Sequence, residues 1–411
     1  MSLKKYLIAI LFTLGFMGLD HSVSATHLFG GEVKYQFLDA NGTTPGRPYR
    51  YRVTYLIYWN CGTGAAPANP TINVGFYAKS TTPGAPATPI PSISGSFTFN
   101  RVFGPPINPP IPAGCTVTIS QCVQLIIYEK VVDLPPSIAG YYTIYSVAAR
   151  NNGIDNLQNS GGENLTLYAD MGPTFRFNNS PVFTDTAVAI VCSGDTATII
   201  NNATDPDGDR LIYSFNQPYS GSGPNFPPST VDYASGYSVS QPFGAGGYAF
   251  LNASTGLTKY YIPNPGEYVV SFEIKEYRNI NGVEQLVGTS IRDIQLFVSN
   301  QCGSNASPRL SIPATSYNVQ AGGSVSFNFK GTDADSLTQP LTFSGELFGP
   351  DGLKIQDLPK ITSNGTGIYS SINFTAPCKP GIYTYNLRVK DVACPFPKTD
   401  PKTILINVLP F

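Results

Sequence analysis

The sequence predicts an all-β protein, and three observations carry this prediction. Short segments in which alternate residues are apolar recur along the 411 residues, as expected for strands buried on one face. The 40 glycines and 36 prolines supply turns between these segments. No long stretch has the apolar period of a helix, and charged residues make up 12% of the chain. Together these features favour several β-sandwiches.

The N-terminus has the features of a secretory signal peptide. Lys4 and Lys5 precede an apolar segment at residues 6–19, and Ala25 ends a run of small residues suited to cleavage. The apolar segment is too short to span a membrane. We therefore expect an extracellular or cell-surface protein, with no membrane span in the mature chain of residues 26–411.

The mature chain divides into three units of the length of an immunoglobulin-like sandwich, at residues 26–180, 181–302 and 303–411. Strands of the first unit are expected at residues 32–37, 49–58, 72–77, 95–103, 122–132 and 141–149. Strands of the third unit are expected at residues 324–329, 341–343, 370–374, 382–390 and 402–408. The middle of the second unit, residues 218–250, is rich in Gly, Pro, Ser and Tyr and is expected to form loops.

The second and third units share a pattern that indicates an internal repeat. Residues 266–276 and 381–391 both begin with Gly, alternate apolar and polar side chains, and end in an acid, Glu276 or Asp391. Each unit also has a short acidic turn, at residues 205–209 or 333–335. An apolar segment follows each turn and lies earlier in the unit than the strand just described. We therefore expect a repeated sandwich with an acidic loop early and a single acid late.

The acidic turn of the second unit is a candidate calcium site. Asp205, Asp207 and Asp209 alternate with Pro206 and Gly208. The proline fixes the backbone angle φ, and the glycine permits a positive φ, so the turn can curl. Calcium prefers roughly 6–8 oxygen ligands, and ~3 crowded carboxylates repel one another unless a positive charge neutralises them. The spacing is not that of an EF-hand, and an ordinary acidic surface turn is the alternative.

The end of the later strand is predicted to close this site. Sandwich loops at one end converge, so Glu276 is expected to meet the acidic turn. Asp333, Asp335 and Asp391 would form a weaker second site, because Leu337 stands where the third aspartate would fall.

The seven cysteines allow disulfides in an exported protein. Cys192 and Cys302 follow apolar segments that we expect to be the first and last strands of the second unit, parallel and adjacent. Their ends would then meet, so these two cysteines are predicted to pair. Cys378 and Cys394 are predicted not to pair, because an eight-step strand of about 26 Å separates them.

The composition speaks against several function classes. Beyond the signal peptide the only histidine is His27, which leaves no basis for a histidine-dependent nucleophile or a zinc site with several histidines. The net charge of −1 gives no electrostatic case for nucleic acid. Two carboxylates would suffice for a glycosidase, and the sequence leaves this alternative open. The acids cluster in turns of the repeat, however, which favours ion binding over a catalytic cleft, so we expect a protein that is not an enzyme.

The tyrosines in the glycine-rich loops of the second unit are candidates for ligand contact. These are Tyr219, Tyr233, Tyr237 and Tyr248. Packing of the loops onto the sheet is the alternative explanation for them.

The order of motifs along the mature chain resembles that of large secreted proteins of the Bacteroidetes, which often end in a gliding-motility-associated sorting domain. The motifs are His27-Leu-Phe-Gly-Gly-Glu, Tyr58-Trp-Asn-Cys, Arg150-Asn, Ala203-Thr-Asp-Pro-Asp-Gly-Asp, Glu276-Tyr-Arg and Ile291-Arg-Asp. The resemblance implies adhesin-like chains of cadherin-like and PKD-like sandwiches. It also implies a sorting domain that these residues do not include, so we expect a longer reading frame or another route of export.

The same resemblance bears on the remaining cysteines. It implies a disulfide between Cys115 and Cys122. The paired cysteines of the family are replaced by Ala148 and Ala149, which would leave Cys61 without a partner.

Two functions follow as hypotheses. The first is a secreted structural and adhesive protein, stiffened by Ca²⁺, whose partners are other surface proteins, cell-surface glycans or extracellular matrix. The second is a glycan- or polysaccharide-binding module that accompanies an enzyme.

Overall fold

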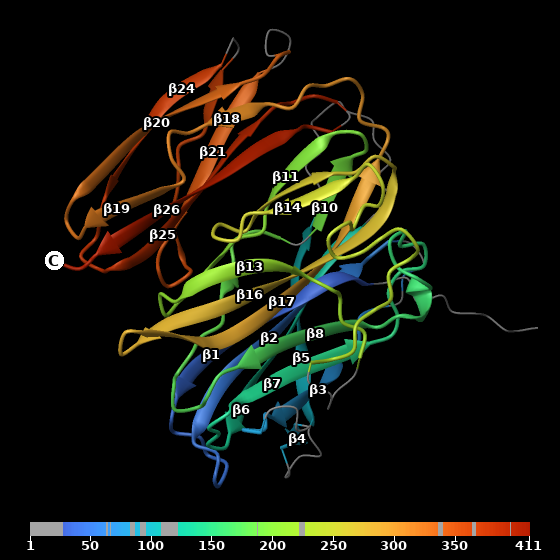
Figure 1. The fold of residues 1–411 in the computed structure, drawn as a ribbon, viewed down its shortest axis with the longest axis vertical. Helices are drawn as coiled ribbons and strands as arrows, with labels where there is room; N and C mark the ends of the chain where they lie inside the picture. Colours follow the sequence, from blue (N-terminus) through green and yellow to red (C-terminus); the bar gives the residue numbers. More distant parts are fainter. Residues whose placement is uncertain are drawn as a thin grey trace, which may run out of the picture.

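The computed structural model describes residues 28–411 except 63, 64, 66, 83–86, 91–95, 108–121, 187, 222–226, 336–339, 364–366 and 395. The predicted signal peptide, His27, Cys115 and Leu337 lie outside the described residues. Within them the chain is built of β-strands, with one short 3-10 helix at Ser160–Gly162, and no helix there is long and apolar enough to cross a membrane. The predicted all-β fold is confirmed, and Figure 1 shows three groups of strands along the long axis.

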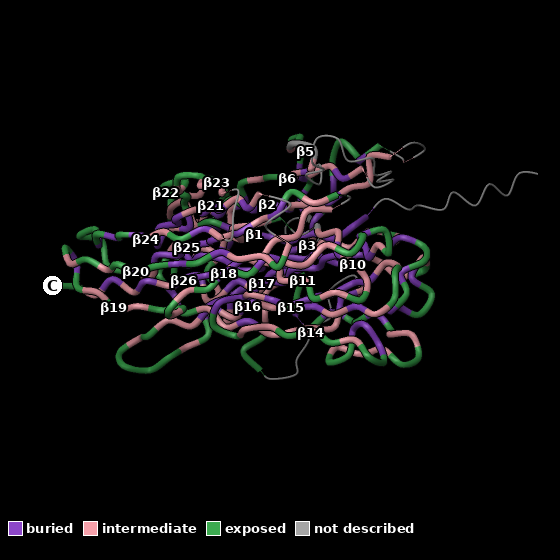
Figure 2. Tube along the Cα trace, turned by 90° about the horizontal axis from the view of Figure 1, so that it is seen from above, coloured by how far each residue is buried: buried purple, intermediate pink, exposed green. Residues whose placement is uncertain are grey.

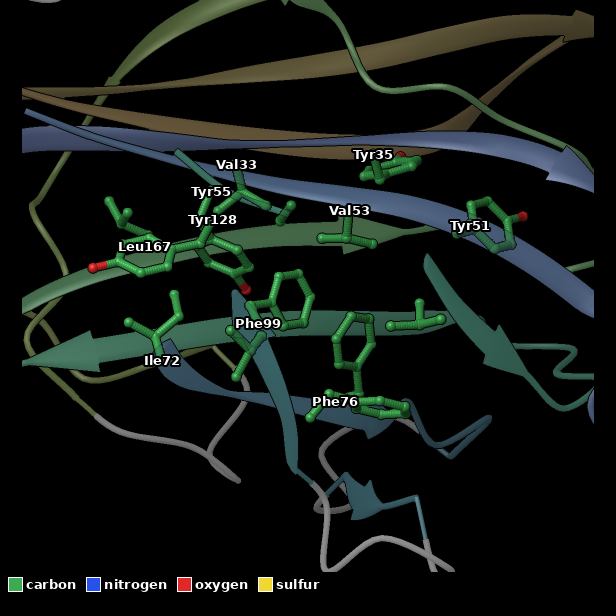
Figure 3. Close-up of a cluster of buried hydrophobic side chains, with 14 of the residues drawn as sticks. Val33, Tyr35, Tyr51, Val53, Tyr55, Ile72, Phe76, Phe99, Tyr128 and Leu167 are labelled. Carbon is green, nitrogen blue, oxygen red and sulfur yellow. The ribbon is translucent and has the colours of Figure 1, made fainter. Parts of the chain in front are cut away.

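The first unit wraps one sheet around an aromatic core. Its strands are β1 (Leu28–Asp39), β2 (Tyr49–Asn60), β3 (Thr71–Ala78), β4 (Thr88–Pro89), β5 (Ser96–Ile107), β6 (Val123–Leu134), β7 (Tyr141–Val147) and β8 (Leu165–Met171). They follow the order β1-β2-β6-β5-β3-β7-β8. Figure 3 shows Tyr55, Phe76 and Phe99 converging between these strands, and each is fully buried. Packing of these side chains stabilises the sheet, to which the rest of the molecule is attached.

The second unit has two packed sheets. Its strands are β9 (Val182–Phe183), β10 (Val188–Cys192), β11 (Thr196–Ile200), β12 (Ala203–Thr204), β13 (Arg210–Asn216), β14 (Tyr248–Leu251), β15 (Leu257–Tyr261), β16 (Gly266–Ile280) and β17 (Val283–Ser299). One sheet contains β10, β17, β16 and β13, and the other has the order β11-β15-β14. The expected loop region at 218–250 gives way to β14 at residue 248.

The third unit repeats this arrangement. Its strands are β18 (Arg309–Ser311), β19 (Ser316–Gln320), β20 (Ser324–Thr332), β21 (Leu341–Phe348), β22 (Lys354–Asp357), β23 (Ile361–Ser363), β24 (Ile368–Thr375), β25 (Gly381–Lys390) and β26 (Thr399–Leu409). The order β19-β26-β25-β21 matches β10-β17-β16-β13, and in both units the first pair is parallel and the others antiparallel. The predicted repeat is confirmed, and both units are immunoglobulin-like sandwiches.

Strand β17 joins the first unit to the second. It pairs with β8 around Thr289 and with β1 around Asp293, so the sheet of the first unit continues across the expected boundary at residue 180. Arg292 of β17 is fully buried and forms an ion pair of 2.5 Å with Glu32 of β1. The first unit is therefore completed by a strand that lies far away in the sequence.

The disulfides confirm one prediction and correct another. Cys192 bonds to Cys302, because β10 runs parallel to β17 and ends beside it. Cys122 bonds to Cys61 rather than Cys115, since Asn60 pairs with Val123 in antiparallel strands, which places Cys61, after Asn60, opposite Cys122, before Val123. The expectation that Cys61 lacks a partner is therefore wrong.

The two cysteines of the third unit agree with the prediction made for them. Cys378 is exposed and free, whereas Cys394 is disulfide-bonded, so the two do not pair. The strand β25 lies between them, as expected.

Candidate functional site

The acidic turn between β12 and β13 is held in shape by its first carboxylate. Asp205 accepts hydrogen bonds from the backbone N–H groups of Asp207 (2.9 Å) and Asp209 (3.0 Å) through one oxygen. Gly208 takes a positive φ of 79°, which a residue with a Cβ adopts rarely. The structure brings the three aspartates together, with one oxygen of each within 4.8 Å of the others.

Glu276 lies near the acidic turn, but it stands inside β16, which continues to Ile280, and not at the end of the strand where the sequence placed it. Its side chain is fully buried, and Asn178 donates a hydrogen bond of 2.6 Å to it. Burial raises the pKa of Glu276 well above its usual range, and the nearby charge of Asp205 adds to this effect. Glu276 is therefore a buried acid with other carboxylates nearby.

Arg278 is the counter-ion that the sequence analysis missed. Its guanidinium donates two hydrogen bonds to Asp209, at 2.7 and 2.6 Å, and one to Asp207 at 3.0 Å. Its position two residues after Glu276 was the available signal, because alternate residues of a strand face the same side. Asp207 and Asp209 are thus partly neutralised without a metal ion.

Two oxygens of the cluster remain without a partner. Asp205 Oδ2 and Glu276 Oε1 are buried and form no hydrogen bond among the described residues. The three aspartates and Glu276 carry four negative charges when all are ionised, and Arg278 supplies one positive charge, so three negative charges are in excess. Burial raises the pKa of Asp205 to about 8. A divalent cation bound by these oxygens would compensate the excess charge with the ligands that Ca²⁺ prefers.

The acidic turn also contacts the segment that leads out of the first unit. Asn179 donates two hydrogen bonds of 2.7 Å to Asp207, one from its backbone and one from its side chain. The same asparagine accepts a hydrogen bond of 2.9 Å from the backbone of Phe37 in β1. The turn therefore connects the second unit to the edge of the first.

The other side of the turn faces the third unit. A cavity of about 170 Å³ lies between the turn and strands β25 and β26, and its lining includes Asp205, Thr384 and Leu405. We name the acidic turn with Glu276 and Arg278 the acid joint, because it lies where the three units meet.

The second acidic site is only partly assembled. The backbone N–H of Asp335 donates a hydrogen bond to the Asp333 carboxylate. Burial raises the pKa of Asp333 to about 6, and the neighbouring acids Asp335 and Asp391 add to this effect. Asp391 accepts hydrogen bonds from the backbones of Ala393 and Lys398 at one oxygen and from Asn305 at the other. Its oxygens therefore organise the loop after β25.

The four candidate tyrosines do not form one surface. Tyr219 is buried in an aromatic cluster, Tyr233 packs beside buried aliphatic side chains, and Tyr237 lies against Tyr268. Tyr248 alone among them is exposed, at 44%. For the other three, the alternative explanation of loop packing is supported.

A separate, partly buried acid, Glu267, gives a test of the electrostatics. Burial raises the pKa of Glu267 to about 7, and the charge of Asp155 adds to this effect. The folded state holds the proton of Glu267 more tightly than the unfolded state does. The contribution of this residue to the free energy of unfolding is therefore fully present at low pH and is lost as the pH rises through about 7. After allowance for the partial exposure of the Glu267 side chain, the free energy of unfolding falls by about 1–2 kcal/mol between pH 5 and 8.

We therefore expect Glu267→Gln to melt above the parent protein at pH 8 and close to it at pH 5. The amide stays neutral and can still accept the hydrogen bond of 2.6 Å from Gln295. Melting curves at both pH values measure the effect, with Glu129→Gln at an exposed pair with Arg52 as the control. An equal difference from the parent at both pH values would contradict the prediction.

Comparisons with known proteins do not assign the chain to a family. No family model matches the chain, and no curated protein is significantly similar to it. The chain is similar to the tandem V-type regions of VCBP3, a v-region-containing chitin binding protein, at 14% identity and a TM-score of 0.21, covering 56% of this chain and 99% of that one. It is similar to the Dpr2 Ig1-Ig2 complex with DIP-Theta Ig1-Ig3 at 10% identity and a TM-score of 0.18, covering 91% and 99%. The fold assignment therefore rests on the strand pairing described above.

Proposed function

We propose that the chain is an exported, non-catalytic structural and adhesive protein whose three units are stiffened by a calcium ion at the acid joint. The observation that carries this proposal is the pair of buried, unpartnered oxygens on Asp205 and Glu276. An ion bound there would tie the first unit, the second unit and the linker between them. Surface proteins, cell-surface glycans or extracellular matrix would be the partners of such a protein.

The contact between the second and third units supports a stiff array. Asn202 donates hydrogen bonds to Asn386 (2.6 Å) and Thr403 (3.2 Å), and all three side chains are buried. At the rim, Arg388 forms an ion pair of 2.7 Å with Asp185 of the second unit. Buried polar contacts of this kind fix one relative orientation, because a shifted interface would leave them unpaired.

Calcium is expected to raise the melting temperature of the whole mature chain. At ~1 mM Ca²⁺ and a Kd of ~0.1 mM, binding adds about 1.4 kcal/mol to the free energy of unfolding. This corresponds to an increase in melting temperature of about 2 °C if the mature chain unfolds as one cooperative unit. Melting in Ca²⁺ and in EDTA measures it, and the intact chain is required because β17 completes the first unit.

Variants of the acid joint separate ion binding from a general salt effect. Asp205→Asn and Glu276→Gln should melt at the same temperature in both buffers. Asp357→Asn, at an exposed position of β22, should keep the calcium response of the parent. Identical melting of the parent protein in Ca²⁺ and EDTA would refute the proposal and leave an acid cluster neutralised by Arg278 and protons.

A further inference from the structure

The sheet β11-β15-β14 has one face in the core and one face in solvent. Ala249 and Leu251 pack against the buried cluster of the second unit, so the alternating residues Tyr248 and Phe250 point outward. They are 44% and 53% exposed. Figure 2 shows β14 at the periphery of the molecule, with exposed and intermediate residues along it. Contiguous exposed apolar side chains rimmed by polar residues mark interaction sites more often than single exposed side chains do.

The tyrosines on this face are held in a defined arrangement. Tyr248 lies opposite Tyr261 of β15, with ring centroids 5.9 Å apart and planes inclined by only 13°. The hydroxyl groups of Tyr248 and Thr196 of β11 share a hydrogen bond of 3.2 Å. Neighbouring strands thus preorganise two parallel rings and a row of hydroxyl groups, which reduces the entropy lost on binding.

A lone positive charge lies beside the rings. Lys259 is exposed, stands opposite Phe250 on β14 and Thr198 on β11, and forms no ion pair among the described residues. The sequence from 233 to 258 contains no Asp, Glu, Lys or Arg, so the surrounding loops are neutral and rich in Gly, Ser and Tyr. The face therefore combines aromatic rings, hydroxyl groups and one uncompensated cation.

We propose that this face binds an acidic polysaccharide, with sugar rings on Tyr248, Tyr261 and Phe250 and a uronate carboxylate on Lys259. The C–H groups of a pyranose ring carry partial positive charge and match the negative face of an aromatic ring. Sugar hydroxyl groups match Thr196, Thr198 and the tyrosine hydroxyls, and a carboxylate complements the unpaired ammonium group. The face is separate from the acid joint, so the inference does not depend on calcium.

The test is binding of the mature chain to polygalacturonate, and to its fully methyl-esterified form, in EDTA. EDTA removes calcium, which could otherwise bridge the polymer to the acid joint. We expect the parent protein to bind polygalacturonate and Tyr248→Ala to weaken the affinity by about tenfold. Lys259→Gln should weaken it about threefold, and should leave affinity for the esterified polymer unchanged.

Controls keep the inference open to refutation. Tyr369→Ala removes a tyrosine that is 65% exposed on β24 of the third unit, and it should bind as the parent does. Melting temperatures identify any variant that fails to fold. The proposal is overturned if neither polymer binds, if Tyr248→Ala and Tyr369→Ala bind equally well, or if Tyr248→Ala converts a dimer of the parent into a monomer in sedimentation. The last result would assign the face to contact between copies of the chain.

Discussion

Replacing Arg150 with methionine is expected to lower the free energy of unfolding by about 3–5 kcal/mol. Arg150 and Asp293 form a two-pronged ion pair with contacts of 2.9 and 2.6 Å, and both side chains are 2% exposed. The arginine also donates hydrogen bonds to the backbone carbonyls of Asn164 and Tyr219. The variant leaves a buried carboxylate without a counter-ion, and urea denaturation measures the loss.

Two further variants test the reason given for this loss. Arg150→Met combined with Asp293→Leu removes both charges and should recover a large part of the stability, since the uncompensated charge disappears. Arg210→Met breaks the ion pair with Glu284, in which both side chains are about half exposed, and should cost less than about 1 kcal/mol. Equal losses for Arg150→Met and Arg210→Met would show that the buried pair is not a major source of stability.

Removing the disulfide between Cys192 and Cys302 is expected to destabilise the protein by about 4 kcal/mol. The bond closes a loop of 110 residues, so its loss releases a large conformational entropy to the unfolded state. The double serine variant avoids a newly freed thiol. Its denaturation midpoint should fall well below that of Cys378→Ser, which changes a free, exposed cysteine and should be nearly neutral. Coincident midpoints would contradict the expectation.

The strands could be predicted because alternation is a local signal, and one disulfide could be predicted because the fold has a common topology. Alternation placed the strand at residues 49–58 within β2 and that at 382–390 within β25. The parallel placement of β10 and β17 followed from immunoglobulin-like topology, and it was enough to pair Cys192 with Cys302. These features depend on side-chain period and on a common fold, both of which are visible in a sequence.

The remaining contacts could not be predicted because alternation identifies a buried face and not the strand that pairs with it. Nothing in the sequence indicated that β1 pairs with β17, or that β2 and β6 bring Cys61 to Cys122. At the acid joint the carboxylates were expected, whereas Asn178 and Asn179 enter it from a linker whose path is set by tertiary packing. Strand pairing and linker paths are therefore what the structure adds.

The shared strand β17 has a consequence for the order in which the chain can fold. The contact between Glu32 and Arg292 spans 260 positions, so β1 and β8 each lack the second of their two neighbouring strands until residues 283–299 have been synthesised. Pairings of such long range form late, because the intervening chain must first be closed into a loop. Strands β1 and β8 therefore each keep one unpaired edge until most of the chain has been synthesised. A nascent protein of this design therefore stays incompletely folded until β17 has been synthesised.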